Sequence, residues 1–95
     1  MHASLWRFRG DPDGLLASYD AMVQELPPSV MRLHLCLRAA DGIVLVDTCP
    51  TRDDFVRFAG GDGFAGLRAR HGLPEPERVE DFPVHRLFLD GAVAS

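Results

Sequence analysis

The clearest pattern in the chain is a strict alternation of apolar and polar residues over positions 31–38. Methionine and leucines alternate there with arginines, a histidine and a cysteine, which is the period of two expected of a β-strand with two different faces. Asp41-Gly42 follows, a dipeptide typical of tight hairpin turns because both residues tolerate positive φ. A second apolar run then extends to Thr48. The pattern predicts a β-hairpin over residues 31–51.

A hairpin loop of two or four residues would place direct cross-strand partners on the same face of this hairpin. We expect one face to be plain hydrophobic core, made of Leu33, Leu35, Leu37, Val44, Val46 and Thr48. The opposite face is the candidate functional face, made of Arg32, His34, Cys36, Arg38, Leu45, Asp47 and Cys49. A register shift of one residue would scramble this sorting.

The residues before the hairpin predict a strand and a helix. Weak alternation over residues 2–9 indicates a first strand, which Gly10 ends. Asp11 and Pro12 are typical of a helix start, as a capping carboxylate followed by proline in the first turn. Apolar residues then recur at helical spacing, at Leu15, Leu16, Tyr19, Met22, Val23 and Leu26. Pro27-Pro28 is expected to end this helix.

The second half of the chain predicts an interrupted helix and a last strand. Pro50 starts the helical region, glycines at residues 60–63 interrupt it, and Asp62 is expected to cap its restart. Three prolines make residues 73–83 an extended loop or an irregular edge. Residues 84–89 alternate again and are predicted to form the last strand.

The predicted order is β-α-β-β-α-β, in one domain spanning residues 1–95 with a tail at 91–95. In a small α+β protein this order predicts a ferredoxin-like fold, with a four-stranded antiparallel sheet and both helices on one face. The other face would be left uncovered, although the strands carry many apolar residues. We therefore expect two copies to pair sheet to sheet as a homodimer.

Composition excludes several classes of protein. The chain is 46% hydrophobic and 25% charged, which is typical of a globular domain. Its net charge is −4 with both signs interspersed, which argues against a nucleic-acid partner. No apolar run approaches the length of a membrane span, and the N-terminus lacks the pattern of a signal peptide. Two cysteines without metal-ligand spacing indicate reduced thiols and a cytoplasmic protein.

The chain resembles the dimeric α+β barrel superfamily, especially the antibiotic-biosynthesis-monooxygenase-like proteins. It does so in its element order, its length and two stretches after the hairpin, DTCPTRDDFVRFA and GFAGLRARHGLPEPERVEDFPVHRLFLDG. The resemblance implies a homodimer whose sheets meet as a barrel, with a small-molecule pocket between each sheet and its helices. Members include cofactor-free oxygenases, cyclases, lactone isomerases and binding proteins. The oxygenases and haem-degrading members use an asparagine, which this chain lacks.

His34 and Asp47 are the main candidates for acid–base chemistry. Imidazole suits proton transfer near neutral pH, and a carboxylate on the adjacent strand would fix its tautomer. Cys49 lies just before a helix start, where the helix dipole can lower a thiol pKa, and facing His34 it would form a nucleophilic pair. The structural alternatives are a half-buried histidine bonded to a carboxylate for packing and a small core cysteine.

The predicted substrate-binding residues are Trp6, Tyr19, Arg38, Phe55, His71 and His85. The aromatic residues would line a pocket for an aromatic ligand, although phenylalanines at helical spacing are first of all core. Arg38 would bind a carboxylate or an enolate of the ligand. The structural alternative is that it is a solvated residue at the end of a strand. The structural alternative for His71 is a helix cap. The structural alternative for His85 is a core histidine whose hydrogen bonds are satisfied. No metal or cofactor is expected, since no short ligand spacing supports one.

The sequence therefore predicts a small homodimeric, cofactor-independent enzyme that acts on an aromatic or polyketide-like molecule. Proton transfer by His34, oriented by Asp47, would drive cyclisation, isomerisation or oxygenation. The first alternative is a non-catalytic dimeric module that binds a small molecule or a partner protein. The second is a purely structural dimer. No nucleic-acid or membrane partner is expected.

Overall fold

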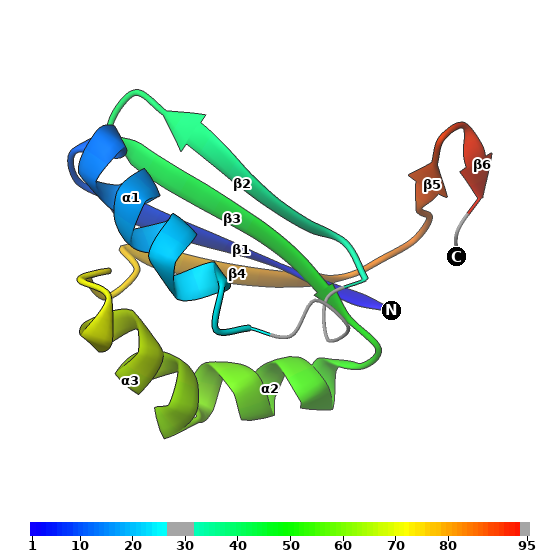
Figure 1. The fold of residues 1–95 in the computed structure, drawn as a ribbon. Coiled ribbons are helices and arrows are strands. Elements are labelled where there is room, and N and C mark those ends of the chain that lie inside the picture. Colours follow the sequence, from blue (N-terminus) through cyan, green and yellow to red (C-terminus); the bar gives the residue numbers. More distant parts are fainter. Residues whose placement is uncertain (27–31, 94–95) are drawn as a thin grey trace.

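The computed structural model describes residues 1–26 and 32–93, and it shows an α+β fold built on a four-stranded antiparallel sheet (Figure 1). The strands are β1 (His2–Arg9), β2 (His34–Ala39), β3 (Gly42–Cys49) and β4 (Arg78–Pro83), in the spatial order β2-β3-β1-β4. β1 and β2 run parallel to each other, because both are antiparallel to β3 between them. This topology agrees with the predicted ferredoxin-like arrangement.

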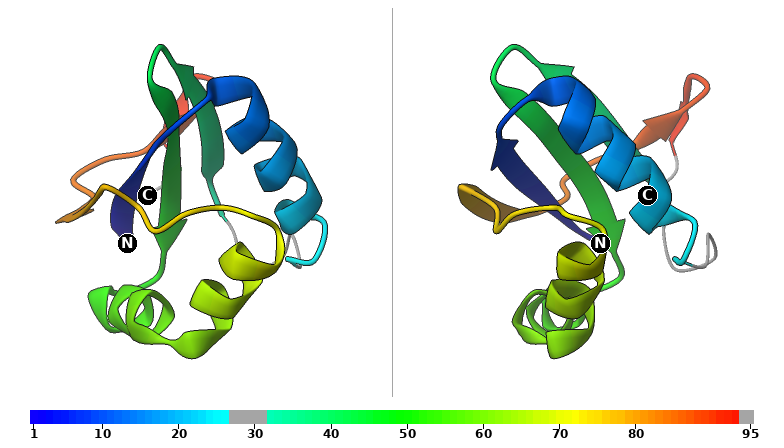
Figure 2. Two further views of the ribbon diagram at one scale, coloured as in Figure 1. Left: turned by 90° about the vertical axis from the view of Figure 1, so that its left-hand side faces the viewer. Right: turned by 60° about the vertical axis from the view of Figure 1, so that its left-hand side comes forward.

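The helices lie on one face of the sheet and around one end of it (Figure 2). α1 (Pro12–Val23) begins as predicted, with the Asp11 carboxylate accepting a hydrogen bond of 3.0 Å from the Gly14 N–H. The interrupted region forms two helices, α2 (Arg52–Gly60) and α3 (Asp62–Arg70), so there are three helices among the described residues and not two. The predicted cap of the restart is wrong by one residue, because Gly61 is the N-cap of α3.

The central hairpin has the register that the alternation predicted. Residues 40–41 form a two-residue loop, and the ladder pairs His34 with Asp47 and Cys36 with Leu45. A Cβ atom on Gly42 would lie 1.8 Å from the carbonyl oxygen of Phe8, so only glycine fits where β3 passes β1. The predicted strand residue Met31 and the predicted helix stop at Pro27-Pro28 lie outside the described residues.

The last strand of the sheet differs from the prediction. β4 occupies the sheet edge that was predicted for residues 84–89, and it pairs with β1 from His2–Pro83 to Arg7–Arg78. Its sequence, RVEDFP, is rich in charge, which an edge strand tolerates because one side meets solvent. Phe88–Leu89 (β5) and Ala92–Val93 (β6) form a separate two-stranded hairpin, so residues 91–93 of the predicted tail are part of a projecting element (Figure 1).

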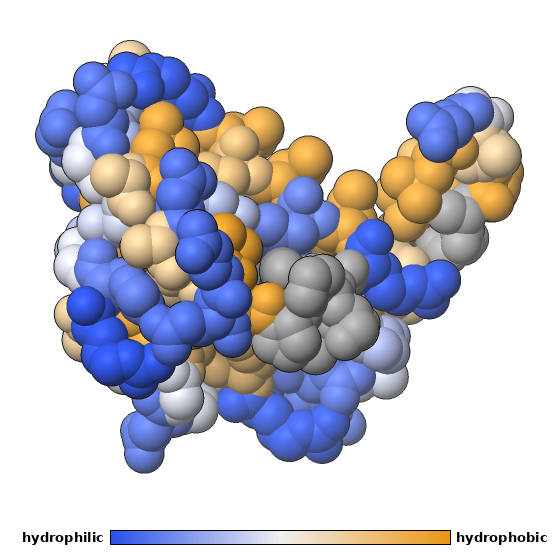
Figure 3. Space-filling model, in the orientation of Figure 1, coloured by the Kyte–Doolittle hydropathy of each residue, from blue (hydrophilic) through white to orange (hydrophobic). Residues whose placement is uncertain are grey.

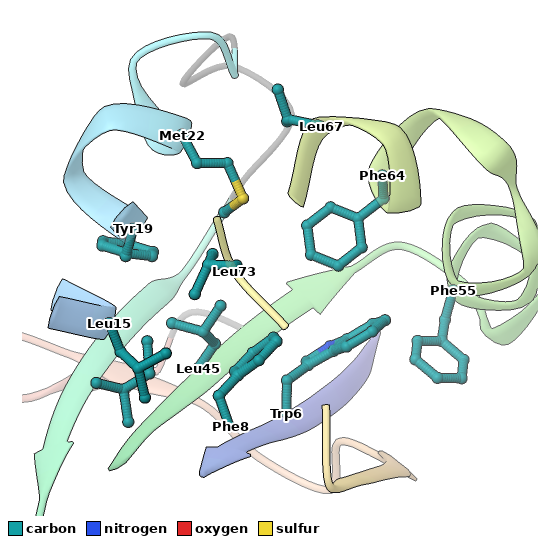
Figure 4. Close-up of a cluster of buried hydrophobic side chains, with 11 residues drawn as sticks. Trp6, Phe8, Leu15, Tyr19, Met22, Leu45, Phe55, Phe64, Leu67 and Leu73 are labelled. Carbon is teal, nitrogen blue, oxygen red and sulfur yellow. The ribbon is translucent and has the colours of Figure 1, made fainter. Parts of the chain in front are cut away.

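The expectation that the leucine face of the central hairpin is hydrophobic core is wrong, and the core lies on the candidate functional face. The helices cover the face that carries His34 and Asp47, whereas Leu35 and Leu37 on the opposite face are each 45% exposed. The reason lies in β1, where Trp6 pairs with Leu45 and so brings the largest side chain of that strand to the helix side. The core consists of Trp6, Phe8, Leu15, Tyr19, Met22, Ile43, Leu45, Phe55, Phe64, Leu67 and Leu73 (Figure 4).

Candidate functional site

A row of four polar side chains crosses the helix-covered face, with one residue from each strand. The ladders pair His34 with Asp47, Asp47 with Ser4, and Ser4 with Asp81. Direct cross-strand partners point to the same side of a sheet, so the four residues lie next to one another beneath the helices. Such a row costs solvation energy unless its members bond to one another or to a ligand.

A cavity of about 500 Å³ opens above the two middle members of this row, Ser4 and Asp47, between the sheet and α2. Its apolar lining includes Leu26, Pro50, Phe55 and Phe58, and its polar lining includes Ser4, Arg32, Asp47, Cys49 and Asp54. Small-molecule sites usually enclose roughly 300–1,000 Å³ and combine an apolar wall with a few polar groups. The size and the lining of this cavity therefore suit a small organic ligand.

A narrow recess of about 20 Å³ lies beside the cavity, bordered by His34 and by Trp6 of the core. The recess and the cavity share three lining residues, namely Leu26, Asp47 and Phe58. Asp47 is therefore the polar residue that borders both spaces, whereas His34 borders only the recess. The predicted imidazole–carboxylate pair thus lies where the two spaces adjoin.

His34 is held between a tyrosine and a carboxylate. Its Nε2 lies 2.6 Å from the Tyr19 hydroxyl, and the two rings stack with centroids 5.7 Å apart. Its Nδ1 lies 3.6 Å from Oδ1 of Asp47, which is an ion-pair separation and too long for a hydrogen bond. Within the part of the chain that the structure describes, this buried Nδ1 has no hydrogen-bond partner. One nitrogen of the imidazole is therefore satisfied and the other is not.

The hydrogen bond between Tyr19 and His34 can run in either direction, and its direction depends on which ring nitrogen of a neutral His34 carries the hydrogen. Burial, reinforced by Cys36, Asp20 and Asp47, raises the pKa of Tyr19 to about 12. The hydroxyl therefore remains protonated at neutral pH, and it can either donate to Nε2 or accept from an Nε2–H. In the second arrangement Nδ1, which faces Asp47, carries no hydrogen and can accept a proton. Tyr19, His34 and Asp47 form a line that ends at the cavity.

Ser4 is the third member of the polar row, and it was not predicted. The indole N–H of Trp6 donates a hydrogen bond of 2.9 Å to the Ser4 hydroxyl oxygen. That bond uses a lone pair of the serine and not its hydrogen, so the serine hydroxyl can donate to a ligand. Trp6 itself is core, as its position in β1 requires, and it reaches the ligand region only along the recess.

The structure does not support a nucleophilic role for Cys49. Its neighbour across the β1–β3 ladder is His2, and its thiol donates to the carbonyl oxygen of Thr51 at 3.2 Å. The expected lowering of its pKa is wrong, because burial and the carboxylates of Asp54 and Asp47 raise the pKa of this thiol. Burial also raises the pKa of the Cys36 thiol. Neither cysteine is in a disulfide.

A second histidine on this face, which is buried and which the sequence analysis missed, lies at the other end of the row. Nε2 of His2 is 2.6 Å from Oδ1 of Asp81, and Nε of Arg52 is 3.2 Å from the same oxygen. The hydrogen bond from His2, followed by the charge of Arg52, lowers the pKa of Asp81. The available signal was the alternation of β1, which places His2 on the same face as Ser4 and Trp6.

The remaining candidates divide into those that reach the cavity and those that do not. Phe55 lines it. Arg38 instead forms an ion pair of 2.7 Å with Asp13 at the surface, and His71 pairs with Glu25 beside Arg70 at the end of α3. His85 is exposed in the segment between β4 and β5. Arg38, His71 and His85 therefore do not line the cavity. His85 also does not lie near His34, as the sequence analysis considered.

No protein-family model and no curated protein matches this chain. Across residues 1–26 and 32–93, no helix has both the length and the apolarity needed to cross a bilayer. In the same residues, no three histidine, cysteine, aspartate or glutamate side chains gather as ligands for a metal ion. The chemistry of the cavity and of the polar row is the basis for a functional proposal.

Proposed function

We propose that the cavity binds a compact aromatic or polyketide-like molecule and that the His34–Asp47 pair transfers a proton to and from it without a cofactor. The observation that carries this proposal is the position of Asp47, which borders the cavity on one side and the recess of His34 on the other. General acid–base catalysis needs a titratable pair of this kind beside a ligand site that excludes water.

The proposed reaction begins when the pair removes a proton from a carbon or hydroxyl group next to a carbonyl of the ligand. The ring of the ligand would lie against Phe55 and Phe58. The Arg32 guanidinium and the Ser4 hydroxyl would stabilise the negative charge of the developing enolate. Return of the proton at another position gives an isomer or a cyclised product, with no atom gained or lost. Oxygenation would require dissolved dioxygen to react with the enolate.

We also propose kinship with the antibiotic-biosynthesis-monooxygenase-like branch of the dimeric α+β barrels. The antiparallel strand order and the cavity between sheet and helices support this proposal. A cytoplasmic location completes it, because a reducing compartment would keep the thiols of Cys36 and Cys49 free.

The same cavity supports a second candidate function, which is ligand binding without turnover. The observation that favours it is the hydrogen bond between Tyr19 and Nε2 of His34, which occupies one imidazole nitrogen in a buried contact. In that case the row of polar residues would only orient a ligand. A partner protein is not needed for this function.

Binding is tested by titrating the protein with compact aromatic ketones while recording the fluorescence of Trp6, the single tryptophan of the chain. We expect saturable quenching, because Trp6 borders the recess. Phe58→Asp should weaken binding at least tenfold by placing a charge in the apolar wall. Val56→Asp is the matched control, since Val56 is on the same helix, is 46% exposed and is not part of the lining.

The variant His34→Ala distinguishes the hypothesis of an enzyme from the hypothesis of a binding protein. Loss of product formation with ligand affinity kept within a few-fold supports catalysis by the pair. An unchanged rate would reject His34 as part of the proton acceptor. Binding by the wild type with no product from any ketone would favour the binding protein.

A further inference from the structure

Arg32 is the one positively charged side chain among the described residues that line the cavity. It lies two residues before His34, and its neighbour Leu33 is bonded to the end of β3. The N–H of Thr48 donates a hydrogen bond of 3.1 Å to the carbonyl oxygen of Leu33, and the N–H of Leu33 donates one of 3.1 Å to the Thr48 hydroxyl. The base of the Arg32 side chain is therefore held at the cavity.

The guanidinium of Arg32 is not used in an ion pair within the described part of the chain. Six other arginines form ion pairs with carboxylates there, namely Arg9, Arg38, Arg52, Arg57, Arg70 and Arg78. Residues 27–31, which lie outside the description, include no acidic residue. The planar donors of a guanidinium match the two oxygens of a carboxylate. Arg32 is therefore available to an anionic ligand in the cavity.

The two carboxylates in the lining already have other partners. Oδ2 of Asp54 accepts hydrogen bonds from the N–H and the hydroxyl of Thr51, at 3.2 Å and 2.9 Å, and its Oδ1 accepts one from Arg57. Asp47 lies beside His34 and accepts a hydrogen bond from the next N–H of the chain. The charge of Asp54 is thus offset by an arginine, and the cavity has a positive end at Arg32 and a negative end at Asp47.

We propose that the ligand of the cavity is an aryl keto acid, whose carboxylate binds Arg32 while its carbonyl group reaches Ser4 and Asp47. This inference rests on the proposed function, and it names the class of molecule on which the His34–Asp47 pair would act. Residues two apart in an extended chain, such as Arg32 and His34, are separated by roughly 7 Å. A benzene ring with a carboxylate and an acetyl group in para positions spans a comparable length.

The charges in the lining give such a ligand one orientation. A carboxylate is attracted to Arg32 and repelled by Asp47, so the carbonyl end of the ligand faces Asp47. The hydroxyl hydrogen of Ser4 is free to bond to the carbonyl oxygen, because the serine uses only a lone pair toward the Trp6 indole. The acidic carbon next to that carbonyl then lies beside Asp47. The charge of the guanidinium also offsets part of the negative charge of the enolate.

The rest of the lining suits the aryl ring of this ligand. Leu26, Pro50, Phe55 and Phe58 provide the apolar wall. In Figure 3 the outward surface over α2, below the grey atoms, is largely hydrophilic, so the apolar side of this helix is on the cavity side. A flat apolar body with one anionic end therefore matches both parts of the lining.

The test compares two ligands that differ in charge and little in shape, para-acetylbenzoate and para-acetylbenzamide, by calorimetric titration of the protein. The wild type is expected to bind the acid at least about tenfold more tightly than the amide, because hydrogen bonds to charged groups are the stronger ones. Arg32→Gln should abolish this preference by weakening the binding of the acid alone. Arg32→Lys, which keeps the charge without the planar donors, should retain part of it.

Arg7→Gln is the matched control, because Arg7 is exposed on the opposite face of the sheet and its loss changes the net charge equally. It should leave the preference for the acid unchanged, and added salt should weaken the binding of the acid more than that of the amide. Thermal unfolding checks that each variant is folded.

Equal affinity of the wild type for the two ligands would overturn the inference and leave the proposed binding of aromatic ketones standing. A preference for the acid that survives Arg32→Gln, or that Arg7→Gln removes equally, would also overturn it. Failure of the wild type to bind either ligand would count against the proposed function itself, and the inference would fall with it.

Discussion

Asp47 lies directly across from His34 in the ladder between β2 and β3, and both side chains are on the face that the helices cover. The 3.6 Å between His34 Nδ1 and Asp47 Oδ1 leaves the imidazole close to the carboxylate without a hydrogen bond to it. Asp47 Oδ1 instead accepts a hydrogen bond of 2.9 Å from the N–H of Thr48. The carboxylate is thereby held in place, and the pair can respond to a ligand in the cavity.

Tyr19→Phe should destabilise the protein, because it removes the hydroxyl that bonds to Nε2 of His34 while keeping the stacked ring. Leaving a buried nitrogen unsatisfied costs about 1–3 kcal/mol. For a domain of this size each kcal/mol lowers the melting temperature by about 4–8 °C. Thermal unfolding measures the effect. The control is a double-mutant cycle with His34→Ala, in which the two changes should be strongly non-additive; full additivity would contradict the contact.

Alkylation of Cys49 by iodoacetamide should be slow at neutral pH and rise only at alkaline pH. Burial and two carboxylates hold the pKa of this thiol above its ordinary value of 9.0. The rate of alkylation is measured against pH in a Cys36→Ser variant, so that Cys49 is the single thiol that can react. A midpoint below pH 8 would show an activated thiolate and would restore Cys49 as a candidate nucleophile.

The alternation over residues 31–38 was sufficient to predict the hairpin and to place His34 opposite Asp47. A period of two leaves no freedom once the loop has two residues, so the sorting into faces followed from local sequence. The choice of the covered face did not follow. It depends on Trp6 and Phe8, which reach the helix side through the long-range pairing of β1 with β3.

Long-range contacts explain the other features that the sequence did not reveal. His2 and Asp81 are 79 positions apart, so no local motif marks their hydrogen bond. The prolines and charges around β4 predicted either an extended loop or an irregular edge, and the structure shows the edge strand. The contact between Tyr19 and His34 and the cavity beneath α2 depend on how the helices pack on the sheet, which hydrophobic spacing does not specify.

Acid should unfold the wild type more steeply than Asp81→Asn. The pKa of Asp81 is lowered from 3.8 in the folded protein by His2 and then by Arg52. Its stabilising effect is therefore complete above the unfolded carboxyl pKa of about 4 and is lost as the pH falls through the lower folded value. Urea unfolding at several pH values between 6 and 2 measures the slope.

Asp81→Asn should be less stable than the wild type at pH 6 and should lose less stability on acidification. Part of the slope should remain, because the pKa values of Asp54 and Glu25 are also lowered, chiefly by hydrogen bonds from Thr51 and His71 respectively. Identical slopes for the two proteins would show that His2 and Arg52 do not hold the Asp81 carboxylate in solution.

Two glycine-to-alanine changes should have opposite effects on stability. Gly42→Ala places a methyl group against the carbonyl oxygen of Phe8 in the β1–β3 ladder, and we expect a loss above about 4 kcal/mol. Gly60→Ala meets no atom within 4 Å in α2 and should stabilise by about 0.5–1 kcal/mol. Urea unfolding compares them. Equal effects would contradict the close approach of the two strands.

Hydrogen exchange into a bound ligand tests the proton-transfer function most directly. An aromatic ketone that quenches Trp6 is incubated with the protein in D₂O, and deuterium at the carbon next to its carbonyl is followed by mass spectrometry. A positioned base accelerates such exchange by about 100-fold or more. We predict acceleration by the wild type and its loss in His34→Gln and Asp47→Asn, both of which should still bind the ketone. Exchange at the background rate while the wild type holds the ligand, or at the wild-type rate in both variants, would contradict the account.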